Sequence, residues 1–593
     1  MNILGVSCHY HDAAAALLQD GQLIAAAEEE RFSRVKHDSR FPRSAIRFCL
    51  ETGNIRGRDL DYVVFFEKPF RKLDRILTSI LHTYPRSRKA FRESMVGWVL
   101  DKLWISSTLQ SELGIEKNKV LFSEHHLSHA ASAFLCSPFN EAAILTVDGV
   151  GEWVTTCCGT GRENQIRLLR QMEFPHSLGL LYSTFTAFLG FEVNEGEYKV
   201  MGMASYGHPR YADKVWKLVR QNGDGSFSLD MDYFCFHHSA ERMFNGRFTE
   251  LFGDARACGM PFVTECSALR TDFSEPEEHR AEMCRINQYY ADIAASAQKV
   301  TEELLVGMAR SLQKETGLKR LCIAGGVGLN SVANSHILHE TDFEEIFVQP
   351  AAGDGGGALG AALWAHHSLL GNPRSYCMEH AYWGQEYSAS EISAFLQKNN
   401  IHHRRIGDTN ELLDTVAAQL TTGKVVGWFQ GRSEWGPRAL GNRSILADPR
   451  NPGMKDIVNS KIKFREPYRP FAPSVLAERA ECYFELPQAT VHYPARYMQY
   501  VAPTKQSKRE TLPAVTHIDG TARVQTVFRE HNPRYYALIE RFGDATGIPV
   551  VLNTSFNLKG EPIVNTLADA VSTFRRSGMD CLVLGDFLVE KND

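Results

Sequence analysis

The stretch ILGVSCHYHDAAAALLQDGQLIAAA, residues 3–27, decides the fold. Its three apolar runs, residues 3–7, 13–18 and 23–27, each have the length of a strand. A polar segment with His11 and Asp12 separates the first two runs, and an Asp-Gly pair separates the last two. Because Asp-Gly between apolar runs is a strong signal for a tight turn, the stretch predicts three consecutive strands joined by two turns.

A second stretch has the same layout. Residues 143–147 are apolar, Asp148 opens a glycine-containing turn, and extended runs over residues 153–158 and 166–169 follow. Two copies of one unit, each with an acid at its first turn, predict two facing half-domains with a ligand between them. The turns near Asp12 and Asp148 would then face one cleft.

The rest of the first part alternates helices and strands. Residues 123–134 predict an alanine-rich helix with Ser123 as its cap, and residues 291–312 predict a long amphipathic helix. Residues 320–324 and 346–349 are apolar strands, each followed by a glycine-rich turn. Strand, glycine turn and helix in succession indicate α/β architecture.

The composition changes near residues 371–373, where Gly-Asn-Pro is typical of a linker. We therefore expect one domain over residues 1–370 and a second α/β domain over residues 380–593.

Composition excludes several classes of protein. At roughly 150 residues per domain, 593 residues are too many for a single small binding module. The 65 basic and 70 acidic residues leave a formal charge of −5, so no overall field attracts nucleic acid or an anionic membrane. The first residues lack the cationic start of a signal peptide, no apolar run reaches the roughly 20 residues of a membrane helix, and the 13 cysteines include no CxxC pair. We expect a cytoplasmic enzyme with no nucleic-acid or membrane partner.

Four residues fit a metal site. His125 and His129 stand four apart on the predicted helix, so both imidazoles project from one face. Asp148 and Asp354 each follow an apolar strand at a glycine-rich turn, where open α/β sheets present ligands. Two imidazoles and two carboxylates suit divalent iron, manganese or magnesium, whereas the absence of thiolate ligands disfavours structural zinc. An isolated pair of histidines at this spacing is more often part of a packed helix, so the two acids carry the prediction.

The two glycine turns, residues 325–330 and 352–357, lie between a strand and a helix. Backbone N–H groups at such a junction favour phosphate, although glycine there serves tight packing equally well. The candidate nucleotide-binding residues of these turns and of the helix that follows the first are Gly325, Gly326, Gly328, Asn330, Asn334 and Gly353.

The second domain holds a basic segment. Residues 431–470 contain nine basic residues against four acids, interleaved with Gly and Pro. A solvated basic face is the usual meaning of such a run. Here the turns favour a pocket for a small phosphate, because RNA binding would need more aromatic residues on a sheet. Arg523 and the residues 553–557, after an apolar strand over 549–552, add donors for an anion.

Ordered motifs along almost the whole chain resemble the NodU/CmcH-type O-carbamoyltransferases, which modify natural products. These motifs are HDAAAALLQDG (11–21), EEERFSRVKHD (28–38), HHLSHAASA (125–133), FPHSLGLLYS (174–183), GEYKVMGMASYG (196–207), AGGVGLN (324–330), GPRALGNRSI (436–445), KFREPYRPFAPS (463–474) and NTSFNLKGEPIV (553–564). The resemblance implies duplicated lobes of the actin and hexokinase superfamily, similar to the tRNA threonylcarbamoyl-transfer protein, and a YrdC-like C-terminal domain.

The resemblance also implies an activity. Carbamoyl phosphate and ATP would give carbamoyl-adenylate with release of pyrophosphate, and the N-terminal domain would transfer the carbamoyl group to a hydroxyl of a small natural product. The metal, with Fe²⁺ favoured over Mn²⁺ or Mg²⁺, would bind at His125, His129, Asp148 and Asp354.

By the same resemblance, carbamoyl phosphate would bind at Lys463, Arg465, Arg523, Asn553, Ser555 and Lys559, and Arg438 and Arg443 would contact the nucleotide. Many relatives have Arg where this chain has Lys559. The lysine would contact the phosphate as a single point charge, whereas an arginine can donate two parallel hydrogen bonds. His11 beside Asp12 would act as a general base or oxyanion partner. Asp232 would orient the acceptor hydroxyl, although a surface acid fits that position equally well.

Two rival functions remain open. One is a fused tRNA threonylcarbamoyladenosine synthase, which the net charge disfavours. The other is a nucleotide-gated regulatory protein without catalysis, which leaves the basic segment without a role. The acceptor is not encoded in any one motif, and a homodimer is a further option.

Overall fold

The computed structural model describes residues 1–93, 102–264, 277–465 and 468–591, so Glu466 and Pro467 of the KFREPYRPFAPS motif lie outside it. The described chain forms two compact units. The first contains Met1–Glu29 and Ser39–Met378, and the second contains Glu30–Asp38 and Glu379–Asp593.

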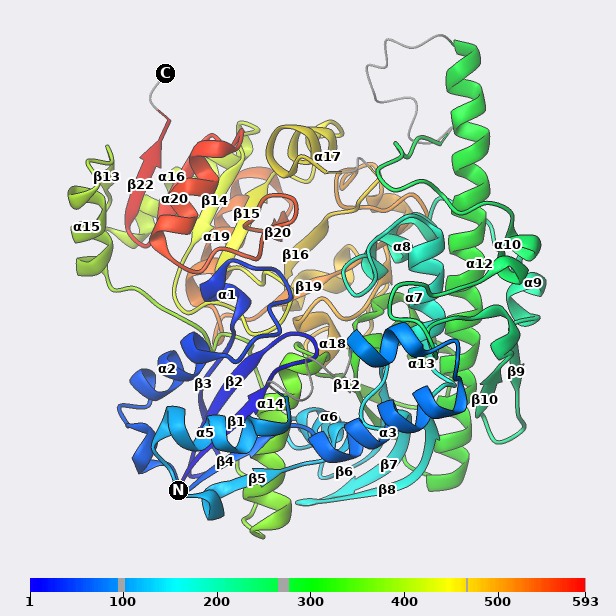
Figure 1. Cartoon of the computed structure of the whole chain (residues 1–593). Coiled ribbons are helices and arrows are strands. Elements are labelled where there is room, and N and C mark those ends of the chain that lie inside the picture. The colour runs from blue at the N-terminus through cyan, green and yellow to red at the C-terminus, as the bar shows by residue number, and fades with distance from the viewer. Residues whose placement is uncertain (94–101, 265–276, 466–467, 592–593) are drawn as a thin grey trace. The chain divides into compact units, whose positions relative to one another are not determined.

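The first sheet of the first unit confirms the strands predicted at the N-terminus. β1 (Asn2–Ser7), β2 (Ala14–Gln19) and β3 (Gln22–Glu28) pair antiparallel, with Asp20 and Gly21 at the second turn. β4 (Tyr62–Phe65) and β5 (Val120–Phe122) extend the sheet in parallel. The strand order is β3-β2-β1-β4-β5 (Figure 1).

The second sheet repeats this plan. β6 (Glu141–Val147), β7 (Val154–Arg162) and β8 (Gln165–Glu173) are antiparallel, and β11 (Arg320–Ala324) and β12 (Glu345–Val348) add in parallel. The order β12-β11-β6-β7-β8 mirrors that of the first sheet. This repetition confirms the duplicated lobes that the sequence predicts.

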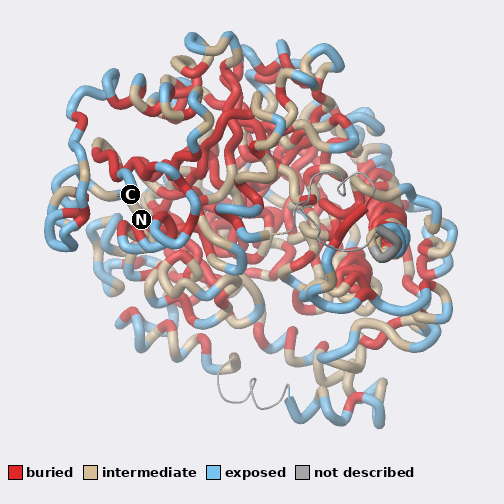
Figure 2. The backbone as a smooth tube through the Cα atoms, turned by 90° about the horizontal axis from the view of Figure 1, so that it is seen from above, coloured by how far each residue is buried: buried red, intermediate tan, exposed pale blue. Residues whose placement is uncertain are grey.

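Two helices meet at the centre of the first unit. α6 (His125–Phe134) lies close to α14 (Asp354–Leu363), because a Cβ at Gly360 would come within 1.9 Å of the Ser128 carbonyl oxygen. α14 also lies against β1, where a Cβ at Gly5 would meet the Ala358 oxygen at 1.8 Å. Every residue of α14 is buried, and long buried stretches run through the chain (Figure 2).

The other helices of the first unit surround these sheets. α12 (Glu277–Thr316) extends beyond the predicted residues 291–312 at both ends, because apolar periodicity marks the packed part of a helix better than its charged ends. The remaining longer helices are α2 (Arg43–Thr52), α3 (Pro69–His82), α5 (Ile105–Leu113), α7 (Leu178–Phe188), α8 (Glu197–Ala204), α10 (Gly246–Phe252) and α13 (Ser331–Glu340).

The second unit has its own mixed sheet, with the order β13-β22-β21-β14-β15-β20-β16-β19 in the described residues. Its strands are β13 (Arg404–Arg405), β14 (Val426–Phe429), β15 (Arg443–Ala447), β16 (Ala472–Leu476), β19 (Gln525–Val527), β20 (Val550–Ser555), β21 (Cys581–Leu584) and β22 (Phe587–Glu590).

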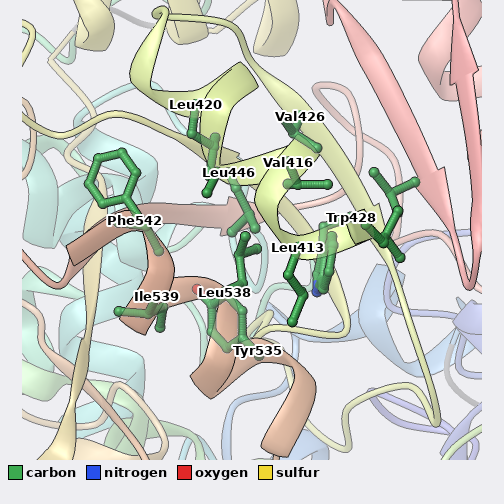
Figure 3. Close-up of a cluster of buried hydrophobic side chains, with 14 of the residues drawn as sticks. Leu413, Val416, Leu420, Val426, Trp428, Leu446, Tyr535, Leu538, Ile539 and Phe542 are labelled. Atoms are coloured by element: carbon green, nitrogen blue, oxygen red, sulfur yellow. The ribbon is translucent and has the colours of Figure 1, made fainter. Parts of the chain in front are cut away.

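α16 (Thr409–Thr421) and α19 (Pro533–Thr546) pack together in the core of this unit. Leu413 and Val416 of α16, Trp428 of β14, and Leu538 and Phe542 of α19 are among the buried side chains of this core (Figure 3). The sheet and its helices confirm the predicted C-terminal α/β domain. Two further helices of this unit are α15 (Ala389–Lys398) and α20 (Leu567–Arg576).

Over the described ranges, no helix combines the length and the apolar character that crossing a membrane requires.

Candidate metal centre and anion site

The four predicted metal ligands lie together in the first unit. His125 and His129 come from consecutive turns of α6, Asp148 follows β6, and Asp354 is the first residue of α14. All four are buried, and one ligand atom from each lies within 4.8 Å of the others. We call these residues the histidine–aspartate cluster.

The geometry of this cluster suits a shared cation. The Nε2 atoms of His125 and His129 are 3.1 Å apart, and His125 Nε2 lies 3.1 Å from Asp148 Oδ2. Each Nε2 is 3.6 Å from Asp354 Oδ1. The Nδ1 atoms of both rings and Asp354 Oδ2 are buried without a hydrogen-bond partner among the described residues. Converging nitrogen and oxygen donors of this kind fit a divalent cation.

Electrostatics show that the cluster already stabilises positive charge. Burial opposes protonation of His129, but hydrogen bonds and charges from Asp148 and Asp354 outweigh it and raise the pKa of His129 to about 9. Burial likewise opposes ionisation of Asp148, and the two histidines hold the pKa of that carboxyl well below its usual value. A metal ion bound here would have to displace a proton, so its affinity would depend on pH.

Residues distant in the sequence position the helix that carries the two histidines of this cluster. The N-terminus of α6 is capped by Glu152, whose Oε1 accepts from His125 N at 3.0 Å. Ser123 is not the cap, contrary to the prediction, because its hydroxyl donates to the Glu124 carbonyl. His126 hydrogen-bonds with Thr146 Oγ1 (2.7 Å) and the Val154 carbonyl (2.9 Å), so it supports the second sheet instead of binding a ligand.

The first predicted phosphate turn serves the cluster directly. Gly326 N donates to Asp148 Oδ1 at 2.9 Å, so this amide orients a carboxylate. Gly325 has a φ of +93°, and a Cβ there would lie 2.2 Å from the Val147 oxygen, so glycine is required. Gly328 N donates to the Gly325 carbonyl. The turn therefore holds β11 against the end of β6.

The other candidate nucleotide residues of the first unit have internal partners or a helix-end position. Asn330 caps α13 through Ala333 N, and its side chain hydrogen-bonds with Gln298. Asn334 donates from Nδ2 to the Gly328 carbonyl. Gly353 precedes the first residue of α14, next to Asp354. Of this set, Gly353 is therefore placed best for a phosphate, at the N-terminus of a buried helix.

His11 and Asp12 form a pair at the first hairpin turn. His11 Nδ1 lies 2.8 Å from Asp12 Oδ2, and Nε2 lies 3.1 Å from the Asn194 carbonyl. Burial opposes the charged form, but Asp12, Asp354 and the Asn194 carbonyl outweigh it and raise the pKa of His11 to about 10. The imidazole is therefore protonated at neutral pH, which suits it to donate a hydrogen bond and not to act as a base.

Asp232 has the surroundings of a surface acid. Its side chain is 69% exposed and forms an ion pair with Arg247. Among the groups around it, nothing supports a role in orienting an acceptor.

In the second unit, Lys463 lies next to the strand β20. Its Nζ donates to Ser555 O (2.6 Å) and Asn557 O (2.9 Å), and approaches Ser555 Oγ (3.2 Å) and Asn557 Oδ1 (2.5 Å). Lys463 is only 3% exposed. Burial and the neighbouring Arg465 and Arg469 hold its pKa well below the usual value for lysine.

More cations surround this lysine. Burial and the charges of Arg438 and Arg469 lower the pKa of Arg523. Arg465 donates from Nε to Asn459 Oδ1 at 2.7 Å and lies 4.6 Å from the centre of the Phe471 ring. We call Arg438, Lys463, Arg465, Arg469 and Arg523 the cation cluster. Like charges held this close repel one another, and a bound anion would relieve the repulsion.

The remaining predicted donors differ in their surroundings. Asn553 lies inside β20 and not after it, and its Nδ2 donates to Gln525 Oε1 (2.9 Å) and Ser474 Oγ (3.1 Å). Ser555 closes the same strand and donates to Asn557 Oδ1 at 2.7 Å. Lys559 is exposed.

Arg443 has a structural role that differs from the predicted nucleotide contact. It is fully buried, and its terminal nitrogens donate to the carbonyls of Gln385, Gln430 and Gly431. Its guanidinium lies 3.6 Å from the centre of the Phe429 ring. We therefore do not propose Arg443 as a ligand for nucleotide.

The last residue of the predicted donor segment 553–557 links two other residues of this site. Asn557 accepts from both Lys463 and Ser555, so it links them.

The duplicated lobes with acid-bearing first turns, together with a separate C-terminal unit, define an α/β protein of two compact units. Sequence comparison then gives the family. The pattern described as "Carbamoyltransferase N-terminus" matches residues 2–363, and "Carbamoyltransferase C-terminus" matches residues 417–591. The chain belongs to the carbamoyltransferase family and is a transferase, which confirms the predicted resemblance.

Several relatives are similar over long ranges. An uncharacterized protein of Synechocystis, sll1178, is 44% identical over 100% of this chain and 97% of its own length. Nodulation protein NolNO of Sinorhizobium fredii is 38% identical over 98% of this chain and 79% of its own length. The 3'-hydroxymethylcephem-O-carbamoyltransferase of Amycolatopsis lactamdurans is 36% identical over 49% of this chain and 53% of its own length.

Proposed function

We propose that this carbamoyltransferase is ATP-dependent and modifies a hydroxyl group of a small natural product. The observation that carries the proposal is the cation cluster of the second unit, where Lys463 is 3% exposed beside Ser555 and Asn557, and where burial and the charges of Arg438 and Arg469 lower the pKa of Arg523. A dianionic carbamoyl donor and the phosphates of ATP are substrates that such a cluster favours.

The proposed first step gives carbamoyl-adenylate. Because this intermediate keeps one phosphorus atom, pyrophosphate from ATP and the phosphoryl group of carbamoyl phosphate must both leave, with one water consumed. Lys463, Arg465 and Arg523 would hold the donor and offset the charge that develops at the nucleotide α-phosphate. Lys463 Nζ already has four oxygens around it, so an incoming anion would compete with Asn557 and Ser555 for its protons.

The proposed second step takes place in the first unit. The acceptor hydroxyl attacks the carbamoyl carbon, the bond from this carbon to the AMP phosphate oxygen breaks, and the hydroxyl proton is released with AMP. His11, protonated and held by Asp12, would turn its Nε2–H from the Asn194 carbonyl to the carbonyl oxygen of the carbamoyl group as negative charge develops there. A divalent metal at the histidine–aspartate cluster, with Fe²⁺ proposed ahead of Mn²⁺ or Mg²⁺, would hold nucleotide phosphate and polarise the transferred group. We propose that the first step takes place in the domain of residues 380–593 and the second step in the domain of residues 1–370.

The two steps can be tested separately. Purified protein with ATP and carbamoyl phosphate should release pyrophosphate and phosphate in equal amounts, and a hydroxylated acceptor should gain the mass of one carbamoyl group. Lys463→Ala should lower the rate of pyrophosphate release at least 100-fold. His129→Ala should keep a higher rate of pyrophosphate release than Lys463→Ala, but it should lose the bound metal and the transfer of the carbamoyl group to the acceptor.

The matched control is Arg541→Ala, because Arg541 pairs with Asp414 and Asn410 on the second unit. Equal loss of pyrophosphate release in the Lys463 and His129 variants would contradict the division into two sites. Dependence on bicarbonate and threonine, with tRNA as acceptor, would support the threonylcarbamoyladenosine alternative.

A further inference from the structure

Residues 30–38 belong to the second unit although they occur early in the chain. We call this segment the strap; it includes the short helix α1 (Glu30–Ser33). The strap is closed on itself, because Glu30 Oε2 accepts from His37 N at 2.9 Å and the Glu30 carbonyl accepts from Arg34 N at 3.1 Å. Its arginines, Arg31 and Arg34, both donate to main-chain carbonyls of the second unit.

Arg34 binds the end of the loop that follows β20. Its Nη1 donates to the Ile563 carbonyl at 2.7 Å, and its Nη2 donates to the Pro562 carbonyl at 2.9 Å. Its Nε lies 3.5 Å from Oδ1 of Asp569, the residue that completes the capping box of α20. Two hydrogen bonds and an ion pair from one side chain hold this loop more firmly than a single contact would.

The same loop carries Asn557. Val564 N donates to the Phe556 carbonyl at 2.9 Å, and Asn557 Nδ2 donates to the Glu561 carbonyl at 2.6 Å. The carbonyls that Arg34 holds therefore lie one and two residues after the carbonyl that orients Asn557. Asn557 in turn accepts from Lys463, so a rigid loop keeps this lysine in place.

Arg31 holds the other side of the site. It is 3% exposed, and its Nη2 donates to the Gly436 carbonyl at 2.6 Å. Gly436 has a φ of +102° and lies two residues before Arg438 of the cation cluster. One strap thus binds two loops of the site, the loop that carries Arg438 and the loop that carries Asn557.

From these contacts we propose that the strap is a structural part of the anion site and that Arg34 and Arg31 are positioning residues for carbamoyl phosphate. This inference rests on the proposed function. Neither arginine needs to touch the substrate. They act through the loops that carry Asn557 and Arg438, and Asn557 in turn accepts from Lys463.

The test uses the full-length protein and calorimetric binding of carbamoyl phosphate without ATP, with inorganic phosphate as a stable second probe. Arg34→Ala should weaken binding of both anions at least tenfold and raise the KM for carbamoyl phosphate by a similar factor. Millimolar guanidinium should restore much of the loss, because it can donate to the vacated carbonyls, and Arg34→Lys should lose less than Arg34→Ala. Arg541→Ala, the control on the same unit, should bind like the wild type.

The outcomes separate the two claims. If the wild-type protein binds neither anion, the proposed function fails and the inference falls with it. If the wild type binds and Arg34→Ala binds equally well, only the inference is overturned. If Arg34→Ala fails to fold, Arg34→Lys decides, and wild-type affinity for both anions in that variant would overturn the inference.

Discussion

The three histidines of α6 have different roles, and the groups around each imidazole decide its role. His125, His126 and His129 lie on one helix, yet His126 is paired with Thr146 and Val154 while the other two face carboxylates. The pKa of His126 falls well below its usual value through burial and the adjacent histidines, whereas that of His129 rises to about 9. The spacing of four residues predicted which imidazoles share a face, because that spacing is fixed by helix geometry.

The His11–Asp12 pair gives a prediction for pH dependence. The folded pKa of His11, about 10, lies above its ordinary value of 6.5. The stability from this pair is therefore fully present below pH 6.5 and is lost as pH rises from 6.5 towards 10. Asp12→Asn should lower the free energy of unfolding at pH 6, and the difference from wild type should shrink by pH 10. Denaturant unfolding at pH 6, 8 and 10 measures this, and a difference that grows with pH would contradict it.

At the scale of elements, sequence predicted what depends on local pattern and missed what depends on distant partners. The hairpins of both lobes were predicted because alternation and Asp-Gly turns are local signals. The sequence pattern assigned the cap of α6 to the nearby Ser123. The true cap, Glu152, lies 27 residues from His125, and a local pattern cannot find so distant a partner. The resemblance assigned Arg443 to nucleotide, and only the fold shows that main-chain carbonyls of two separate segments accept from its guanidinium.

The contact between α6 and α14 gives a prediction at the same scale. A Cβ at Gly360 would lie 1.9 Å from the Ser128 carbonyl, so Gly360→Ala must push the helices apart and move Asp354 away from His125 and His129. We expect a loss of about 1–3 kcal/mol in stability and a tenfold or greater loss of metal affinity. Elemental analysis and metal titration measure the second effect. Gly355→Ala on the same helix is the control, because its Cβ would make ordinary contacts at 3.6 Å or more, and equal metal loss in both variants would contradict the packing argument.

The whole molecule joins two units that each have their own buried core, and this predicts how ligands stabilise it. A ligand that binds only the folded state stabilises the unit that holds it, by about 2.7 kcal/mol at a concentration 100 times its Kd. Thermal unfolding should therefore show two transitions, of which chelation lowers one and carbamoyl phosphate raises the other. His129→Ala should abolish the effect of the chelator alone, and Lys463→Ala should abolish that of carbamoyl phosphate alone. Because the strap belongs to the second unit, Arg34→Ala should lower the same transition that carbamoyl phosphate raises. A single transition that both ligands shift together would show that the units unfold as one.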